Sequence, residues 1–356
     1  MPNKGYIPEI PKDTDFFAGA ETGITYKEVT DDWTSLLPSD EKQKFRNFDT
    51  MACVTFSCAN SIETQVNYLI RNVLPKETID KLDELGFLDA DYKFNISDRA
   101  LAKMSGTTRE GNMLTKVIHT ARKQGLLAER DWKASDKFDW DEYYAEIPQE
   151  LKDKALKILD IFEFKYEWVV YPTTADKNAN LAYHLKQAPI QLAAPVCNGW
   201  STGDVKTCPK VDPEHATMAY EVKDKVSILD HYSPFKKKLA LDYPIPWGQK
   251  IVVEVKQPKQ EPVKPKHAFA FVLLKGMTAK NSQEYIVEDI KALQDILRYE
   301  GLLTVNSTGN YLFHTAAAVL KWQIKHNVAP LAELNKLQGE RVGQKTIAKL
   351  NELYNM

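Results

Sequence analysis

The stretch from Asn47 to Val73 constrains the fold most, because it predicts a loop that runs directly into a long helix with a cysteine at its entrance. A thiol in that position meets unpaired backbone N–H groups and the positive end of the helix dipole, and both favour the thiolate. Cys53 lies about 140° around the helix from Cys58. We therefore expect Cys58 to be packed and Cys53 to point elsewhere. Apolar residues recur at helical spacing and predict one buried face, namely Cys58, Ile62, Val66, Leu69 and Val73.

The pentapeptide CVTFS, from Cys53 to Ser57, resembles the nucleophile motif of the papain-like cysteine peptidases. In that family the cysteine is followed by an aromatic residue, a small residue, Phe and Ser, and Val54 stands here in place of the aromatic residue. Asn47 stands six positions before the cysteine, where the family has a Gln whose amide helps to form the oxyanion hole. The resemblance implies that Cys53 is the nucleophile and that Asn47, with the Cys53 backbone N–H, binds the oxyanion. The glycines and the extra cysteine usual before the nucleophile are absent.

A thiol nucleophile needs a neighbouring base and a third group that orients the base. His215 begins the strand-like run HATMAYEV, and Asp230 follows 15 residues later at the end of KVSILDHY, which is the distance of an antiparallel hairpin. This order resembles the papain-like arrangement, in which His begins one strand and the Asn of an NSW motif ends the next. The resemblance implies a triad of Cys53, His215 and Asp230. A carboxylate in the third place favours imidazolium, so we expect the pKa of His215 to be raised.

The pattern around these residues changes from helical to strand-like along the chain. Helical segments are predicted in KETIDKLDELGFL, in NISDRALAKMSGT with Asn95 or Ser97 as cap, and in GNMLTKVIHTARKQGLL ending at Gly125. From about Phe164 the runs FKYEWVVYP, IQLAAPVCNGW, HATMAYEVK, KVSILDHY and QKIVVEVK predict strands. We therefore predict an α+β, papain-like domain over 46–256, with a helical lobe, an antiparallel β lobe and the active site between them.

The segments that flank this domain have a different composition. Residues 1–45 are rich in Pro, Gly, Asp and Thr, and we expect a surface arm or a pro-segment, with a short helix in SDEKQKF capped by Ser39. The run QPKQEPVKPK at 257–266 has a proline at every third or fourth position and predicts an extended linker.

The last 90 residues, 267–356, resemble the three-helix peptidoglycan-binding domain of cell-wall hydrolases. The resemblance is carried by DIKALQDIL at 289–297, by Gly301, by TGNYLFHTAAAVLKWQ at 308–323 and by GERVGQKTIAKL at 339–350. It implies a glycan ligand, for which Tyr311, Trp322 and Gln323 are candidate contacts. Trp322 stands at helical spacing from Val319, so a packing role is the simpler interpretation for it.

Composition narrows the remaining choices. Of 356 residues 43% are hydrophobic and 27% charged, which is ordinary for a globular protein, and the net charge of −2 gives no argument for nucleic acid. No secretory signal or membrane-spanning run is present, so we expect a soluble product with no membrane insertion. Cys197 and Cys208 are close enough to bridge, yet free thiols fit equally well. A zinc ion shared by these cysteines and His215 lacks the usual CxxC clustering, so no metal and no cofactor are predicted.

Together the two resemblances predict a thiol peptidase that cuts peptides of bacterial peptidoglycan, in an arrangement like that of a phage lysin acting at the cell wall. Three alternatives stay open: a wall-anchored endopeptidase for general proteins, a transglutaminase-like acyltransferase with the same Cys, His, Asp order, and a catalytically inactive wall-binding protein. The oligomeric state does not follow from the sequence.

Overall fold

The computed structural model describes residues 5–9, 28–30, 32–170, 173–205, 208–256 and 264–355. The chain divides into two compact units, Met1–Gln257 and Pro258–Met356. Most of the predicted linker, 257–263, and most of the predicted arm lie outside the described residues, while 264–266 have no regular structure. The first unit combines a helical lobe with a strand-rich lobe, and the second is mainly helical, so the α+β prediction is confirmed.

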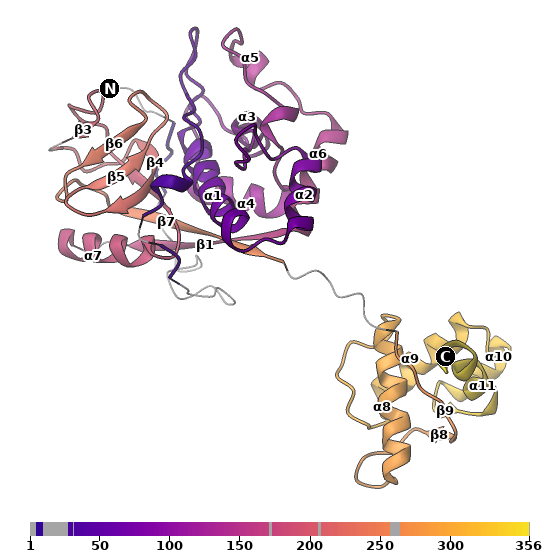
Figure 1. Ribbon diagram of the computed structural model, residues 1–356. Helices are drawn as coiled ribbons and strands as arrows, with labels where there is room; N and C mark the ends of the chain where they lie inside the picture. Colours follow the sequence, from indigo (N-terminus) through magenta and orange to yellow (C-terminus); the bar gives the residue numbers. More distant parts are fainter. Residues whose placement is uncertain are drawn as a thin grey trace. The chain divides into compact units, whose positions relative to one another are not determined.

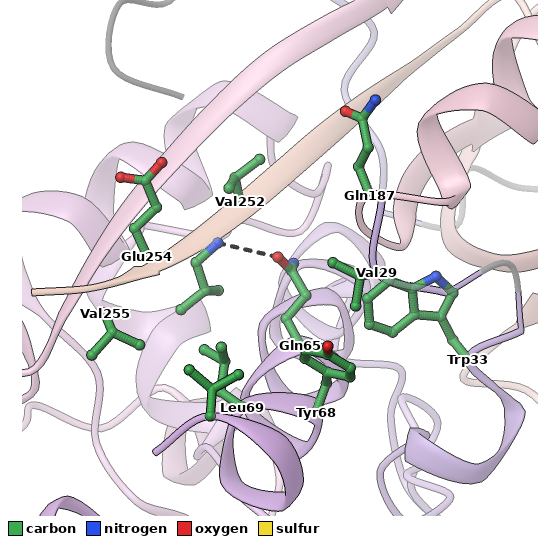
Figure 2. A pocket seen from close by; sticks show the side chains of 11 residues that line it. Val29, Trp33, Gln65, Tyr68, Leu69, Gln187, Val252, Glu254 and Val255 are labelled. Atoms are coloured by element: carbon green, nitrogen blue, oxygen red, sulfur yellow. Dashed lines mark hydrogen bonds between the residues drawn. The ribbon is translucent and has the colours of Figure 1, made fainter. Parts of the chain in front are cut away.

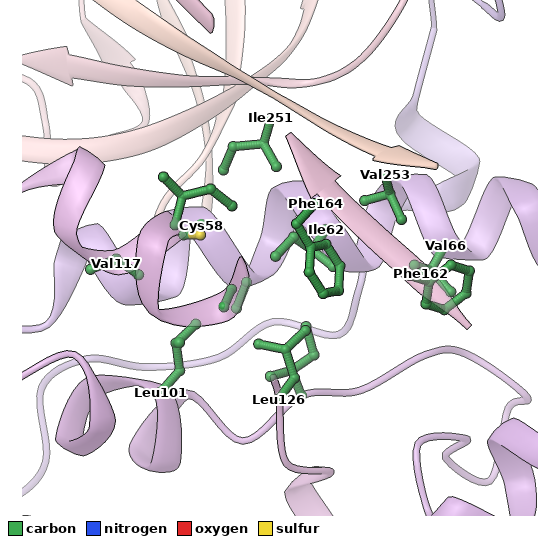
Figure 3. Packing of buried hydrophobic residues seen from close by; sticks show 14 of the residues in the cluster. Cys58, Ile62, Val66, Leu101, Val117, Leu126, Phe162, Phe164, Ile251 and Val253 are labelled. Atoms are coloured by element: carbon green, nitrogen blue, oxygen red, sulfur yellow. The ribbon is translucent and has the colours of Figure 1, made fainter. Parts of the chain in front are cut away.

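The helix α1, Cys53–Asn72, lies in the interior of the first unit. Figure 1 shows α2, α3 and α6 gathered on one side of α1 and the strands β3 to β6 on the other. Every residue from Cys53 to Asn67 is buried, so the expectation that only the Cys58 face is packed is wrong. The reason is that α1 packs against α3 and α4 and also against β2, β4 and β7. Cys58, Ile62 and Val66 face an aromatic and aliphatic core that includes Phe162 and Phe164 (Figure 3).

The helices that cover α1 begin and end at residues with recognisable local chemistry. α2 spans Lys76–Leu85 and ends at Gly86, whose φ of +99° suits glycine. α3 spans Asp98–Met104, and the Ser97 hydroxyl accepts the Ala100 N–H at 3.1 Å, as the predicted cap requires. α4 spans Leu114–Gln124 and ends at Gly125. Shorter helices follow: α5 Trp140–Tyr143, α6 Gln149–Ala155, and 3-10 turns at Thr34–Leu36, Glu129–Asp131 and Leu156–Asp160.

The predicted helix after Ser39 does not form. Instead, the Gln43 backbone N–H donates to the His231 carbonyl at 3.1 Å, and Lys44 pairs with Asp49 in an antiparallel bridge. These long-range bonds satisfy backbone groups that a single helical turn would leave open, so the segment forms a tight hairpin.

A seven-stranded sheet forms the other lobe, in the order β1-β7-β2-β4-β5-β6-β3. Its pairs are antiparallel except β3 with β6. The helix α7, Thr174–Leu185, lies between β1 and β2 in the chain and was not predicted. The strands are β1 Phe162–Val170, β2 Ile190–Ala194, β3 Asp204–Val205, β4 His215–Val222, β5 Val226–Leu229, β6 Lys236–Leu239 and β7 Trp247–Val255.

The second unit contains four helices among its described residues: α8 Glu284–Tyr299, α9 Phe313–Lys325, α10 Leu331–Leu337 and α11 Gln344–Tyr354. A two-stranded sheet pairs β8, Leu273–Leu274, with β9, Arg341–Val342. The three predicted helices are present, whereas α10 and the small sheet were not predicted. Tyr311, Trp322 and Gln323 are buried, and the Trp322 indole N–H donates to Glu300 at 2.8 Å. Packing is therefore the role the structure gives these three side chains. Within the described part of the chain, no helix has the length and apolar character needed to cross a membrane.

Candidate active site

Cys53 stands where the two lobes of the first unit meet. It is the first residue of α1, so its backbone N–H has no acceptor within the helix. The Ala216 N–H, from β4, lies 3.4 Å from the sulfur and can stabilise negative charge there. The Ser57 hydroxyl donates to the Cys53 carbonyl at 2.8 Å and accepts the Gln191 amide from β2 at 2.8 Å. The serine of the CVTFS motif thus fixes the start of α1 against the sheet.

His215 and Asp230 are brought together by the β4–β5 hairpin, in which Met218 pairs with Leu229. His215 Nε2 lies 2.6 Å from Asp230 Oδ1, and both side chains have no exposed surface. The other ring nitrogen, Nδ1, is buried and has no hydrogen-bond partner among the described residues, which leaves it for the Cys53 thiol. The structure therefore gathers Cys53, His215 and Asp230 into one site.

The second carboxylate oxygen of Asp230 is held as firmly as the first. Oδ2 accepts the Trp200 indole N–H at 2.6 Å and lies 2.8 Å from the Lys237 ammonium. Neither contact was predicted from the sequence. The run KKKL around Lys237 carries no signal for a buried charge.

The charges of the site are strongly coupled. Burial opposes a charge on His215, but Asp230 and Cys53 outweigh it and raise the pKa of His215 to about 10. Burial would likewise raise the pKa of Asp230, but His215 first, and then His231 and Lys237, hold the pKa of that carboxyl below its usual range. The arrangement therefore favours an imidazolium at His215, between Asp230 and the Cys53 sulfur, as a thiol nucleophile requires of its base.

His231 adds a second buried imidazole to the same region. Its Nε2 lies 3.2 Å from the Asn60 amide nitrogen and so acts as acceptor, and burial lowers the pKa of His231 to about 3. His215, Asp230 and His231 place candidate metal ligands within 4.8 Å of one another. A metal ion fits this set poorly, because the Lys237 ammonium already supplies a cation to Asp230 at 2.8 Å. The zinc alternative also fails, since Cys197 and Cys208 form a disulfide.

The fourth predicted residue, Asn47, lies exposed in the turn between Lys44 and Asp49. Gln43, at the base of the same hairpin, carries a carboxamide that is fully buried and donates to Asp49 Oδ1 at 2.9 Å. Asp49 in turn accepts the backbone N–H of Met51, two residues before Cys53. Gln43 is therefore the amide that the fold connects to the nucleophile loop. It lies ten residues before the cysteine rather than six, so motif spacing overlooks it.

A short N-terminal segment, residues 5–9, packs beside the start of α1. The Gly5 carbonyl accepts the Asn112 N–H at 3.0 Å, and Ile7 donates to the Asn112 carbonyl at 2.9 Å, which pairs the segment with the helical lobe. Tyr6 is fully buried, and its hydroxyl accepts the Trp247 indole N–H from β7 at 3.1 Å. Burial raises the pKa of Tyr6 to about 12, and the charge of Cys53 contributes to the rise. Residues 5–9 thus bridge both lobes and help to leave Cys53 without exposed surface.

A separate apolar pocket of about 360 Å³ lies along the second half of α1 and the end of β7 (Figure 2). Its lining includes Trp33, Tyr68 and Val255, and also Gln65, whose side-chain Oε1 accepts the Val253 N–H at 3.1 Å. Neither Cys53 nor His215 lines this pocket, so it is not part of the site described above.

The sequence matches no family model and no curated protein. Among solved structures, the chain is similar to xylellain, a cysteine protease from Xylella fastidiosa, with a TM-score of 0.45 and 16% identity over 71% of this chain and 95% of that one. It is also similar to the proform of the ragweed pollen cysteine protease Amb a 11, with a TM-score of 0.43 and 11% identity over 67% of this chain and 69% of that one. For the digestive procathepsin L 3 of Tenebrio molitor larval midgut, the TM-score is 0.44 and the identity 13%, over 70% of this chain and 76% of that one.

Proposed function

We propose that this chain is a thiol peptidase that hydrolyses peptide bonds through Cys53, His215 and Asp230. The observation that carries the proposal is the 2.6 Å bond from His215 Nε2 to Asp230 Oδ1, which leaves Nδ1 for the buried thiol at the start of α1. This is the set of a nucleophile, a base and an orienting group that acyl transfer requires.

In the proposed reaction, the Cys53 thiolate attacks the peptide carbonyl carbon and forms a C–S bond. The resulting oxyanion is bound by the Cys53 backbone N–H and a side-chain amide. The C–N bond then breaks, and the His215 imidazolium protonates the departing amine. Water, deprotonated by His215, attacks the thioester, and the C–S bond breaks to release the carboxylic acid and restore the thiol–imidazole pair.

Two side-chain amides are candidates for the oxyanion donor, Asn47 and Gln43. Asn47 is the donor expected from the motif spacing, but its side chain is exposed in the turn between Lys44 and Asp49. Gln43 is buried and bonded to the residue that holds the nucleophile loop, so its side chain is positioned at lower entropic cost. We favour Gln43 as the donor.

The wall peptide remains the preferred substrate class, because the second unit resembles a peptidoglycan-binding domain. Since Tyr311, Trp322 and Gln323 are buried, wall contact falls to exposed side chains of this unit. Phe271 and Tyr285 form such a pair, with exposures of 41% and 45% and ring centroids 4.6 Å apart. We propose that this pair contributes to wall binding and that the second unit raises the local concentration of the peptidase at its substrate.

We further propose that residues 5–9 act as a pro-segment. Tyr6 fills the space beside Cys53 and joins Trp247 of the sheet to Asn112 of the helical lobe, so a peptide substrate and this segment compete for the same place. Displacement or cleavage of the segment is then required for full activity.

The decisive experiment compares the full chain, Cys53→Ala and Cys58→Ala on purified peptidoglycan. Cys58 is a matched control, since it is buried on the same helix five residues later. Release of free amines by the wild type and by Cys58→Ala, but not by Cys53→Ala, supports the wall peptidase. Cleavage of casein alone keeps the catalytic assignment and removes the wall substrate. Incorporation of an added amine identifies an acyltransferase. Failure of Cys53 to react with an epoxide probe, both in the full chain and in Tyr6→Ala, overturns the catalytic proposal.

Wall binding is tested separately with Cys53→Ala in the full chain, so that the substrate stays intact. Sedimentation with purified walls should fall when Phe271→Ala and Tyr285→Ala are added. Phe313→Ala is the control. Phe313 is 70% exposed, more than Phe271 or Tyr285, but among the described residues its ring contacts only that of its neighbour His314. Equal sedimentation of all variants would contradict the assignment of this pair.

A further inference from the structure

A buried lysine contacts the carboxylate of the triad. Lys237 Nζ lies 2.8 Å from Asp230 Oδ2, while Asp230 Oδ1 faces His215 at 2.6 Å. The side chains of Lys237 and Asp230 both have no exposed surface. Lysine is among the residues least often fully buried, and it is buried when a partner offsets the loss of hydration. The pairing of this lysine with the orienting carboxylate therefore needs an explanation.

The strand β6 delivers Lys237 to this position by alternation. Its sequence is KKKL, and Lys236 and Lys238 are exposed while Lys237 and Leu239 are buried. Successive side chains of a strand point to opposite faces, so only the middle lysine reaches the site. The three neighbouring lysines have the same chemistry but different surroundings, and this makes the outer two natural controls.

Every N–H of the Lys237 ammonium has an acceptor. Besides Asp230 Oδ2, the ammonium donates to the backbone carbonyls of Tyr232 and Pro234. The same loop is closed by the Asp230 N–H, which donates to the Phe235 carbonyl at 2.7 Å. An ammonium has three donors and no acceptor, so this set is complete. Lys237 is therefore fixed in one place relative to the carboxylate.

The charges of the site balance only when Lys237 is counted. In the reactive state Cys53 and Asp230 each carry −1, while His215 and Lys237 each carry +1. Without Lys237, the same buried site carries a net charge of −1. Charge in a buried site is costly unless it is compensated nearby. His231 does not supply the missing charge, because burial keeps it neutral at ordinary pH.

We propose that Lys237 is a positioning residue of the peptidase site, which holds Asp230 ionised and in place and limits how strongly that carboxylate retains the proton on His215. This inference rests on the proposed function. A carboxylate alone would bind the imidazolium proton so tightly that His215 becomes a poor acid toward the departing amine. A carboxylate that also pairs with an ammonium still orients the ring, but its electrostatic attraction for the imidazolium is weaker.

The test is the pKa of His215 itself, measured by NMR titration of the full chain with labelled histidine, with His215→Gln used for assignment. We expect the pKa of His215 to be highest in Lys237→Met, lower in the wild type, lower again in the double variant Asp230→Asn with Lys237→Met, and lowest in Asp230→Asn. Removing the ammonium should raise the pKa of His215 in both backgrounds. The other groups that face His215 are unchanged in all four proteins: Cys53 of α1, Trp200, and His231 and Tyr232 after β5, with Asp49 bonded to the Tyr232 hydroxyl.

Peptide hydrolysis gives the second readout. Lys237→Met should lower kcat at least tenfold, with a smaller change in KM, and should move the alkaline limb of the pH profile upward. Lys236→Met and Lys238→Met should behave as wild type. A purely structural role for Lys237 predicts lower stability with an unchanged pKa of His215, and that result overturns the proposal. If Lys237→Met does not fold, the double variant Asp230→Asn with Lys237→Met replaces it, because that variant leaves no unpaired charge. The proposal is then overturned if the pKa of His215 in the double variant is no higher than in Asp230→Asn. If the wild type hydrolyses no peptide, the proposed function fails, while the titration order still decides the role of Lys237.

Discussion

The indole N–H of Trp200 donates to Oδ2 of Asp230 at 2.6 Å, on the carboxylate oxygen that does not face His215. Trp200 is 6% exposed and its ring lies edge-on to His215 with 5.6 Å between the centroids. The residue that orients the base is thus itself oriented from the loop between β2 and β3. The proposed triad is therefore held by contacts beyond its own three members.

This relationship predicts the effect of Trp200→Phe. The substitution keeps an aromatic ring but removes the donor, so a buried charged acceptor loses one bond, at a cost of about 1–3 kcal/mol. We expect kcat to fall about tenfold, corresponding to ~1.4 kcal/mol of transition-state stabilisation, with little change in KM. Steady-state kinetics on a fluorogenic peptide would measure this. Trp247→Phe, which alters the indole that donates to Tyr6 instead, should leave the Asp230 contacts intact and kcat no lower.

The oxyanion assignment separates Gln43 from Asn47. If Gln43 is the donor, Gln43→Ala should lower kcat on the order of a hundredfold, as removal of a single oxyanion-hole donor does. Asn47→Ala should change kcat less than twofold, because that side chain is exposed in the turn. Both variants are compared in the same peptide assay, with circular dichroism to verify folding. A large loss in Asn47→Ala with none in Gln43→Ala would restore the assignment based on motif spacing.

The N-terminal segment should limit access to the thiol. Gly5 has a φ of +102°, and a Cβ at this position would lie 2.2 Å from the Met51 carbonyl oxygen. Gly5→Ala should therefore displace the segment and raise the rate of Cys53 alkylation on the order of tenfold, which corresponds to ~1.4 kcal/mol. Tyr6→Ala should act in the same direction by removing the side chain that fills the space. Pro8→Ala, at an exposed position, is the control, and an alkylation rate equal in all three variants would contradict a covering role.

The raised pKa of His215 also predicts a pH dependence of stability. The pKa is about 10 in the folded protein and about 6.5 in the unfolded chain, so the folded state binds more protons between these values. The stabilisation is complete below about pH 6.5 and is lost as the pH rises toward 10. Urea unfolding between pH 6 and 10 should show a falling free energy of unfolding for the wild type and a flatter profile for His215→Gln. His119→Gln, at an exposed position on α4, should keep the wild-type slope.

The parts of the fold that follow from periodicity were predictable, and those that depend on distant partners were not. The apolar spacing from Cys58 to Val66 specifies α1, although Val73, at the end of the predicted row, lies beyond the helix and is 55% exposed. Alternation specifies β4 and β5, so His215 and Asp230 can be paired from the sequence. Lys237 is buried only because the β5–β6 turn places it against Asp230, and nothing in KKKL distinguishes its second lysine from the other two. The proposed donor Gln43 stands ten residues before Cys53 instead of six, because a hairpin separates it from the nucleophile loop, and the motif spacing does not include that hairpin.

Because α1 is buried on all sides, the activity expected at Cys53 depends on the stability of the whole first unit. Its first fifteen residues are packed by both lobes, and the nucleophile is the first of them. The sulfur therefore has no local hinge by which it can shift while the rest of the molecule stays intact. Loss of activity on heating should coincide with cooperative unfolding of the first unit. A substitution that loosens the packing of either lobe against α1 should lower kcat even where the fold is retained.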